Sequence, residues 1–534
     1  MPIAQRCTIQ RSAEAQVHAS CSGEGFGVVS CPMNLAAAFS ESVQKHSEKV
    51  ALFWGDTRFT YSELSSRSLF VSGILRKQFQ VSPGDRVALL LKNCPEFIPS
   101  LFGIFQSGAV AVPINNFLKP DEISYILNDA GIDTIITDTE LSAHFQLLKT
   151  KRPALKLMNA QNMLASFPTP PGGIRFDTEL LKNPLRKESD LAVLIYTSGT
   201  TGRPKGAMLS HGNLLHNVES CRHCLHTVED DRFAVLLPMF HSYMLTVGIL
   251  LPLLVGGSIV IVKSLHPVRN LIEEIYTKRP TILPAFPQFY RSLVNAELPG
   301  KLPLRICISG SAPLPGQVLK EFEERFRIPL IEGYGLSEAS PVVAKNPLDG
   351  THKAGSIGVP IPNVEVSVQD DAGKMLGPQE IGEICVRGGN VMMGYWNQLE
   401  ETARAFRNEW LLTGDLGYRD EDGYYFITDR KKDMLLVNGN NVYPREIEEV
   451  IYQFPNVKET AVVGQADARR GEQAIAFVVP NEGAAVDSEA LLKFVRSKLA
   501  DYKVPRQVII SPALPRNATG KILKTELRKQ LATK

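Results

Sequence analysis

The chain has 534 residues, of which 44% are hydrophobic and 21% are charged, so it is too long for one hydrophobic core and too apolar for a disordered chain. Lys plus Arg (58) nearly balance Asp plus Glu (56), and a net charge of +2 gives no general attraction for nucleic acid or anionic membranes. We expect a globular protein of two or more domains that holds any anionic ligand in a local site.

The N-terminal segment, residues 1–32, is polar and has no continuous apolar core, which predicts a flexible leader and not a secretory signal. Eight cysteines are too few for a disulfide scaffold in a chain of this length, and they favour reduced thiols in the cytoplasm. The most apolar stretch, Val247 to Val262, is shorter than the roughly 20 residues that span a bilayer. It predicts a buried helix and strand.

Between residues 33 and 430, short apolar runs alternate with helix-like stretches, and this alternation favours an α/β domain with mixed sheets and helices. The predicted strands include Arg86–Leu91, Gly108–Pro113, Thr134–Thr137, Arg305–Ser309 and Glu383–Arg387. The Pro- and Gly-rich segment Ser166–Gly173 predicts a loop inside this large domain.

The sequence pattern changes after Asp429 and predicts a separate, smaller α+β domain over residues 431–534, joined at the charged run near Lys432. Its predicted elements are a strand (Met434–Val437), a turn (Asn438–Asn441), a helix (Pro444–Tyr452), two strands (Glu459–Gly464 and Ala474–Pro480) and a helix (Ser488–Leu499).

The most informative segment is Tyr196–Asn213, YTSGTTGRPKGAMLSHGN, in which hydroxyl residues and glycines alternate before a lysine. Backbone N–H groups, hydroxyls and one cation in such a loop can wrap a polyphosphate. The loop residues are Thr197, Ser198, Gly199, Thr200, Thr201, Gly202 and Lys205. The P-loop spacing fails because Lys205 follows a proline and precedes no Ser or Thr. Taken alone, the segment could also be a mobile turn.

TSGTTGRPKG resembles the phosphate-loop signature of the adenylate-forming superfamily, which comprises acyl-CoA synthetases, luciferases and peptide-synthetase adenylation domains. Similar signatures follow in the family's order over about residues 34–530: PMFHSYMLTVG, SGSAPL, GYGLSEAS, TGD, DRKKDMLLVNGNNVYPREIE and PRNATGKILK. The segments LSEASP, DRKKDML and NVYPREIE are most similar to those of fatty acyl-CoA synthetases. The resemblance implies a two-domain enzyme that uses ATP, Mg²⁺ and coenzyme A.

The resemblance also implies roles for residues of the nucleotide site. Glu338 would hold Mg²⁺ and act as a catalytic residue, Ser337 would reach the α-phosphate, and Tyr334 would lie on the adenine. Asp415 would accept both ribose hydroxyls, with Arg430 behind it. The backbone that lines the nucleotide would come from Gly310, Ser311, Ala312, Gly333 and Gly335. Each of these residues, taken singly, could have an ordinary structural role. Their occurrence together in the family's order favours a role in nucleotide binding.

His241 would be a catalytic residue at the acyl pocket, together with Tyr243, Met244 and Gly335. This sequence has Phe240-His241-Ser242 where adenylation domains place an Asp for an amino group, which favours an organic acid without one. The resemblance favours a medium- or long-chain fatty acid. The alternatives are an aryl or other organic acid, and an acyl-AMP ligase that loads a carrier protein. A catalytically dead scaffold is disfavoured because Lys521, Glu338 and Asp415 are all present.

Lys521 is the implied catalytic lysine, which would contact the substrate carboxylate and the α-phosphate, although the basic tail also permits a solvated lysine. Lys432 would be the hinge, and Gly439 would face the site during thioester formation with CoA. We expect a cytoplasmic monomer or homodimer with no transmembrane segment, and peripheral membrane contact stays open. A neighbouring group of histidines and Cys221-x-x-Cys224 has metal-ligand spacing but lacks a second ligand pair, which disfavours zinc.

Overall fold

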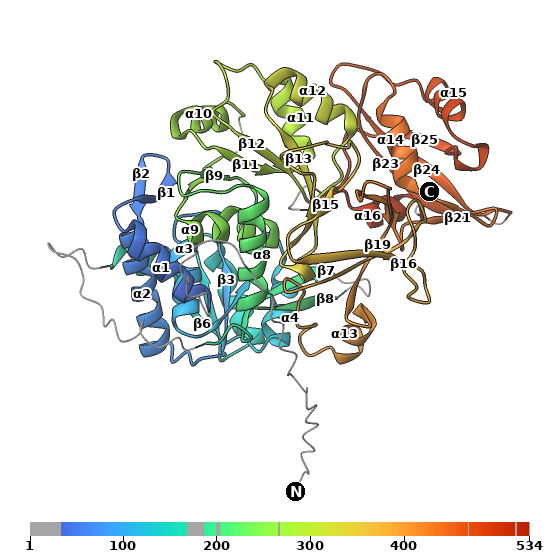
Figure 1. Cartoon of the computed structure of the whole chain (residues 1–534). Helices are drawn as coiled ribbons and strands as arrows, with labels where there is room; N and C mark the ends of the chain where they lie inside the picture. Colours follow the sequence, from blue (N-terminus) through green and yellow to red (C-terminus); the bar gives the residue numbers. More distant parts are fainter. Residues whose placement is uncertain are drawn as a thin grey trace, which may run out of the picture. The chain divides into compact units, whose positions relative to one another are not determined.

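The computed structural model describes residues 34–167, 186–198, 203–264, 268–467, 469–517 and 521–532. The predicted leader, most of the predicted loop at 166–173, and Gly199 to Gly202 lie outside these ranges. The described chain contains four sheets with helices between them (Figure 1).

The largest sheet has nine strands in the order β15-β14-β13-β12-β11-β9-β10-β1-β2. The six strands from β13 to β1 in this order run parallel, and the outer ones pair antiparallel. Its strands are β1 (Val50–Trp54), β2 (Thr57–Thr60), β9 (Arg232–Val235), β10 (Ser258–Ile261), β11 (Ile282–Ala285), β12 (Ile306–Ser309), β13 (Leu330–Gly335), β14 (Val342–Lys345) and β15 (Val359–Pro360). Most residues of the inner strands are buried and apolar, as expected for parallel strands covered on both faces.

A second sheet has six strands in the order β6-β5-β3-β4-β7-β8. Its strands are β3 (Arg86–Leu90), β4 (Val110–Pro113), β5 (Thr134–Thr137), β6 (Lys156–Asn159), β7 (Leu191–Ser198) and β8 (Pro204–Ser210). The last two pair antiparallel, with Thr197 opposite Lys205. The pairing therefore brings together the two ends of the predicted phosphate loop.

An antiparallel sheet of five strands follows: β16 (Val364–Gln369), β17 (Gly382–Gly388), β18 (Phe406–Arg407), β19 (Trp410–Arg419) and β20 (Tyr425–Arg430). In its register Asp415 on β19 stands opposite Arg430 on β20. Two residues from different signature segments are thus fixed as cross-strand neighbours.

The smaller C-terminal domain carries the fourth sheet, in the order β22-β21-β24-β23 with β25 beside β24 (Figure 1). Its elements are β21 (Leu435–Val437), β22 (Asn440–Val442), α14 (Pro444–Tyr452), β23 (Val457–Asp467), β24 (Gly471–Pro480), α15 (Ser488–Lys498), η4 (Asp501–Lys503), β25 (Gln507–Ile510) and α16 (Lys524–Ala532). Two apolar clusters formed only by residues after 434 fill this domain. The expected fold class, a large α/β domain followed by a smaller α+β domain, is confirmed.

The remaining helices cover the sheets of the large domain. They are α1 (Leu35–His46), α2 (Tyr61–Lys77), α3 (Phe97–Gln106), α4 (Pro120–Asp129), η1 (Leu141–His144), α5 (Phe145–Lys151), α6 (Ala160–Ala165), α8 (His211–Cys224), η2 (Met244–Leu250), α9 (Leu251–Val255), α10 (Val268–Lys278), α11 (Pro287–Asn295), α12 (Gly316–Phe326), η3 (Ser337–Ala339) and α13 (Leu399–Ala405). None of the helices in the described part of the chain has the length and apolar character that a membrane crossing requires.

Most predicted elements agree with the structure to within two residues at each end. The strand expected from Gly108 begins at Val110, because Gly108 has a φ of 78° and cannot continue a strand. The buried stretch Val247–Val262 is confirmed as helix and strand, but its first part belongs to η2, which has π-helical hydrogen bonding. In the C-terminal domain, β23 is longer than predicted at both ends, and β24 begins earlier, at Gly471.

Candidate active site

Asp415 lies at a junction of two sheets and has a partner for each carboxylate oxygen. The Tyr334 hydroxyl donates to Oδ2 at 2.6 Å, and Nε of Arg430 lies 2.9 Å from Oδ1. Burial raises the pKa of Tyr334, and the adjacent Asp415 carboxylate raises it further, so the phenol stays protonated and donates. The same carboxylate raises the pKa of Arg430. The sequence prediction that placed these three residues together agrees with this geometry.

Glu338 lies on η3, shortly after β13, and its carboxylate accepts hydrogen bonds from two hydroxyl groups of distant segments. Thr197 Oγ1 donates to its Oε1 at 3.2 Å, and the Tyr395 hydroxyl donates to the same oxygen at 3.0 Å. Ser337, the preceding residue, shares a hydrogen bond of 2.9 Å with Ser242. The end of β7, the turn after β13 and the segment before η2 therefore converge.

Lys205, the cation predicted for the phosphate loop, is buried on β8. Its Nζ forms an ion pair with Glu401 on α13 and lies 5.3 Å from the centre of the Tyr395 ring. The ion pair lowers the pKa of Glu401, which keeps this carboxylate charged. In this structure the lysine thus pairs with an acid of the protein itself.

The loop after β12 and the end of β13 bring backbone close to these side chains. A Cβ at Gly335 would lie 2.0 Å from the Pro341 carbonyl oxygen, so only glycine fits there. Ser311 has a φ of 68°, an uncommon conformation for a serine, and its hydroxyl is buried with no hydrogen-bond partner in the described structure. Strain and an unsatisfied polar atom are typical of ligand sites. Ala312 follows in the same loop, and Gly333 precedes Tyr334 on β13.

His241 lies just before η2 in the chain, and the nearby side chains of Tyr243 and Met244 are buried. Burial lowers the pKa of His241 to about 4, and the positive charge of Lys521 acts in the same direction. The imidazole is therefore neutral at physiological pH. The Tyr243 hydroxyl donates to the Ile308 carbonyl at 3.0 Å, and a Cβ at Gly310 would lie 3.2 Å from the tyrosine ring. The hydrogen bond therefore holds the Tyr243 ring in a fixed position beside Gly310.

Lys521 lies near the C-terminal end of the chain, and the charges of Asp415 and Arg430 act on its ammonium group. Desolvation lowers the pKa of Lys521 to about 8, Arg430 and Lys432 lower it as well, and Asp415 opposes them. Its backbone N–H donates to the Asn517 side chain at 2.9 Å. The side chain is exposed, and of its electrostatic neighbours Asp415 and Arg430 were predicted for the same site, whereas Lys432 was predicted as the hinge.

The predicted hinge and the predicted CoA-side glycine lie in two turns at the start of the C-terminal domain. Lys432 is exposed in the turn between β20 and β21. Gly439 has a φ of 77° in the two-residue turn between β21 and β22, preceded by Asn438 with a φ of 52°. An Asn-Gly pair with both φ values positive is the preferred turn of a tight hairpin. The structural need for this glycine is therefore clear.

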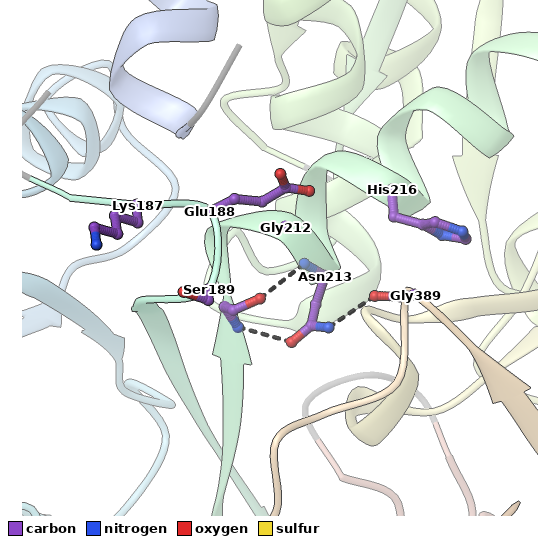
Figure 2. A pocket seen from close by; sticks show the side chains of 8 residues that line it. Lys187, Glu188, Ser189, Gly212, Asn213, His216 and Gly389 are labelled. Atoms are coloured by element: carbon purple, nitrogen blue, oxygen red, sulfur yellow. Dashed lines mark hydrogen bonds between the residues drawn. The ribbon is translucent and has the colours of Figure 1, made fainter. Parts of the chain in front are cut away.

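A separate hollow of about 680 Å³ opens beside the start of α8 (Figure 2). It is lined by Lys187, Glu188, Ser189, Ser210, Gly212, Asn213, His216 and Gly389. Asn213 and Ser210 bond reciprocally as a capping box, and the Asn213 amide donates to the Gly389 carbonyl at 2.7 Å (Figure 2). None of the predicted site residues lines this hollow, and its hydrogen bonds have a structural explanation.

Sequence reasoning missed three residues of the site: Tyr395, Glu401 and Ser242, which bond to Glu338, Lys205 and Ser337. Tyr395 follows a glycine in the run Met393-Gly394-Tyr395, an available signal of an aromatic side chain next to tight backbone. Glu401 lies on α13, which has no buried residues, and no sequence pattern marks it as a site residue. Together the site offers three carboxylates, a neutral imidazole, two ammonium groups and a guanidinium group. This set suits a ligand with phosphates, hydroxyls and a second anionic group.

Comparisons with known proteins agree with this chemistry. The model of the family "AMP-binding enzyme" matches residues 39–396, and that of the "AMP-binding enzyme C-terminal domain" matches residues 446–521. A long-chain-fatty-acid–CoA ligase of Bacillus subtilis (strain 168) is 37% identical over 526 residues, which is 92% of this chain and 94% of the relative. A feruloyl-CoA synthase of Amycolatopsis sp is 37% identical over 486 residues, 89% of this chain and 94% of that protein.

Among solved structures, ATP-bound MatB from Rhodopseudomonas palustris has a TM-score of 0.85 to this chain. The two are 32% identical, and the match covers 93% of this chain and 99% of MatB. The family resemblance found in the sequence is thereby confirmed.

Proposed function

The chain belongs to the AMP-binding enzyme family and is an acid–thiol ligase, and on that premise we propose that it converts a fatty acid of medium or long chain to its acyl-CoA thioester. In the first step a carboxylate oxygen attacks the α-phosphorus of ATP, the bond from phosphorus to the bridging oxygen breaks, and pyrophosphate leaves. In the second step the CoA thiolate attacks the acyl carbonyl carbon, and AMP leaves.

The Tyr334–Asp415–Arg430 group, on whose charges the pKa of Lys521 depends, is the observation that carries this proposal. Asp415 would accept the two ribose hydroxyls, and Tyr334 would place its ring against the adenine. The Lys521 ammonium would stabilise the negative charge that shifts between the acid, the α-phosphate and the leaving group. Because His241 is neutral, it would orient the acid by hydrogen bonding and would not form an ion pair with the carboxylate.

Glu338 suits a hard cation such as Mg²⁺. One carboxylate oxygen is held by two hydroxyl donors, and the described residues contain no group of three His, Cys, Asp or Glu that could hold a metal alone. A cation at Glu338 would therefore complete its coordination with phosphate oxygens and water, as Mg²⁺ commonly does. When bound, Mg²⁺ would neutralise phosphate charge, and Glu338 would fix its place beside the triphosphate.

The acyl side of the site favours an acid without an amino group. Phe240, His241 and Ser242 offer no carboxylate, and the buried Tyr243 and Met244 are apolar. An aryl acid is the second candidate, because the Tyr243 ring held against Gly310 is a flat wall and a feruloyl-CoA synthase is among the relatives. Initial rates with fatty acids of increasing length and with ferulate-like acids would decide between them. A preference for aryl acids would contradict our choice.

The second half-reaction would use a different pose of the C-terminal domain, which we place over residues 431–534. Lys432 would be the hinge because it lies exposed in the turn that joins the two sheets, and Gly439 would then face the thiol.

Lys521→Ala tests the proposal directly. We expect the adenylation half-reaction, followed as pyrophosphate exchange, to fall by roughly two to three decades, because removing one such group costs about 3 to 4 kcal/mol of transition-state stabilisation. Conversion of supplied acyl-AMP and CoA should be largely retained. Lys529→Ala, in the same C-terminal tail, is the matched control and should retain both half-reactions. Equal loss of both half-reactions in a folded Lys521→Ala protein would contradict the assigned role.

A further inference from the structure

Cys221 and Cys224 form a pair that the proposed activity does not use. Both lie on α8, and Cys224 is its last residue. The described residues include no group of three or more His, Cys, Asp or Glu with metal-binding geometry, so the neighbouring histidines do not complete a metal site with this pair. The pair requires another explanation.

The two cysteines lie about one helical turn apart, a spacing that a disulfide can bridge when the last turn of α8 adjusts. Residues three apart on an α-helix have Cα atoms about 5 Å apart, which lies within the range that a disulfide spans. The Cys224 thiol donates to the Cys221 carbonyl oxygen at 3.7 Å, so the Cys224 sulfur lies against Cys221. Cys221 is 1% exposed and Cys224 is only half-buried, so a reagent from solution would meet Cys224 first.

Lys345 supplies a positive charge beside both thiols. The lysine is 6% exposed, and its Nζ donates to the Asn346 carbonyl at 3.1 Å. A single carbonyl compensates a buried ammonium poorly, and burial lowers the pKa of Lys345, while Cys224, Cys221 and Asp349 raise it. The hydrogen bond from Cys221 and the charge of Lys345 lower the pKa of Cys224, and the pKa of Cys221 is raised. The end of a helix disfavours a thiolate, so the lysine is the countercharge that such a thiolate needs.

We propose that Cys221, Cys224 and Lys345 form a redox-modification site, in which a low-molecular-weight disulfide converts the two thiols to an intrahelical disulfide. The Cys224 thiolate attacks one sulfur of the reagent, forming a mixed disulfide and releasing one thiolate. The Cys221 sulfur, after losing its proton to solvent, then attacks Cys224 and releases the second thiolate. The two cysteines are oxidised, and the reagent is reduced to two thiols.

This site adjoins the strand that carries Tyr334. Lys345 stands opposite Gly333 in the register of β13 and β14, next to Tyr334. The amide of Asn217 on α8 donates to the Val342 carbonyl at 2.7 Å, and Val342 N–H donates back at 3.1 Å. Oxidation ties the Cys224 sulfur to Cys221, so that it can no longer carry a negative charge to balance Lys345, and it changes the last turn of α8. We therefore expect the disulfide to weaken ATP binding, and this consequence rests on the proposed function.

Peptide mapping tests the chemistry independently of activity. Reduced full-length protein is incubated with oxidised glutathione, free thiols are blocked, and trypsin cleaves after Arg222, between the two cysteines. We expect a disulfide-linked pair of tryptic peptides, reversed by dithiothreitol and absent from Cys224→Ser. Cys385→Ser is the matched control and should behave as wild type. Lys345→Gln should slow formation about tenfold, and Lys345→Arg should restore it.

Glutathione retained on Cys224 without the linked pair, or equal rates in wild type and Lys345→Gln, would overturn the proposed site. The KM for ATP should rise severalfold in oxidised wild type and stay constant in Cys224→Ser after the same treatment. An unchanged KM in oxidised wild type would overturn the link to β13. A reduced protein that fails to activate any acid with ATP would instead contradict the proposed function, while leaving the peptide result intact.

Discussion

The Asp415 group and the Glu338–Lys205 region are two polar parts of one site, and they are built differently. Tyr334, Asp415 and Arg430 lie on β13, β19 and β20, and each oxygen of the carboxylate has its partner. Asp415 and Arg430 are held by strand register. Glu338 and Lys205, by contrast, contact residues from a turn, a hairpin end and a separate helix.

This difference separates a preorganised part of the site from one that must rearrange. A ribose can bind to Asp415 without displacing the Arg430 ion pair, because a carboxylate accepts several hydrogen bonds. A phosphate near Lys205 must compete with the Glu401 carboxylate, which already neutralises the lysine. Substitutions in the Asp415 group should therefore abolish ATP binding, and those in the Glu338–Lys205 region should change its strength.

The largest effect is expected for Asp415→Asn. Hydrogen bonds to a charged acceptor contribute about 1.5 to 3 kcal/mol each, so loss of the charge should lower kcat/KM for ATP roughly a hundredfold. Steady-state kinetics at varied ATP measures this. Asp420→Asn, which loses an ion pair to Lys353 near the end of the same hairpin, is the control and should keep kcat/KM within a few-fold. A wild-type value for Asp415→Asn would mean that the ribose does not bind there.

The next effect concerns Glu338→Gln. An amide is a weaker ligand for a hard cation than a carboxylate, so the Mg²⁺ concentration at half-maximal rate should rise by about tenfold or more. The amide can still accept hydrogen bonds from Thr197 and Tyr395, which separates the loss of charge from the loss of packing. Glu365→Gln, in an exposed pair with Arg387, controls for the loss of a carboxylate. An unchanged Mg²⁺ requirement would exclude Glu338 as the ligand.

A smaller effect is expected in the pH profile of adenylation. Because the pKa of Lys521 is about 8, its ammonium is present below this pH and is lost as the pH rises above it. The rate should therefore fall on the alkaline side, approaching tenfold per pH unit. Lys521→Arg keeps its charge and should shift this limb to higher pH, whatever its absolute rate. An identical alkaline limb in both proteins would assign the titration to another group.

The same contrast explains how much the sequence could predict. Tyr334, Asp415 and Arg430 occur in short segments that resemble the family's signatures, and this resemblance implied a common nucleotide site, but no strand was predicted where β13, β19 and β20 lie. Their juxtaposition was therefore predictable in outline. The register that places Arg430 opposite Asp415 depends on the pairing of β19 with β20, which the sequence analysis did not predict.

Glu401 and Tyr395 were not predictable in this way. Glu401 lies 196 residues after Lys205, and the contact depends on how α13 packs beside β8. No periodicity in α13 marks this glutamate apart from Glu400, and both acids pair with Arg404. Only tertiary packing distinguishes the two acids. Likewise, the π-helical turn of η2 arises from packing around buried Met244 and Gly248, which the apolar run alone did not indicate.

The smallest expected effect, and the sharpest test of the contrast, is that of Glu401→Gln. The Glu401 carboxylate competes with phosphate for Lys205, so its neutralisation should lower the KM for ATP by about threefold, a size typical of partly exposed ion pairs. Glu400→Gln removes an acid from the same turn of the same helix without touching Lys205, so it should leave the KM unchanged. High salt should reduce the difference between Glu401→Gln and wild type, because screening weakens the ion pair that the substitution removes. If the KM rises instead, Glu401 positions Lys205 for the phosphate, and this half of the site would be preorganised in the same way as the Asp415 group.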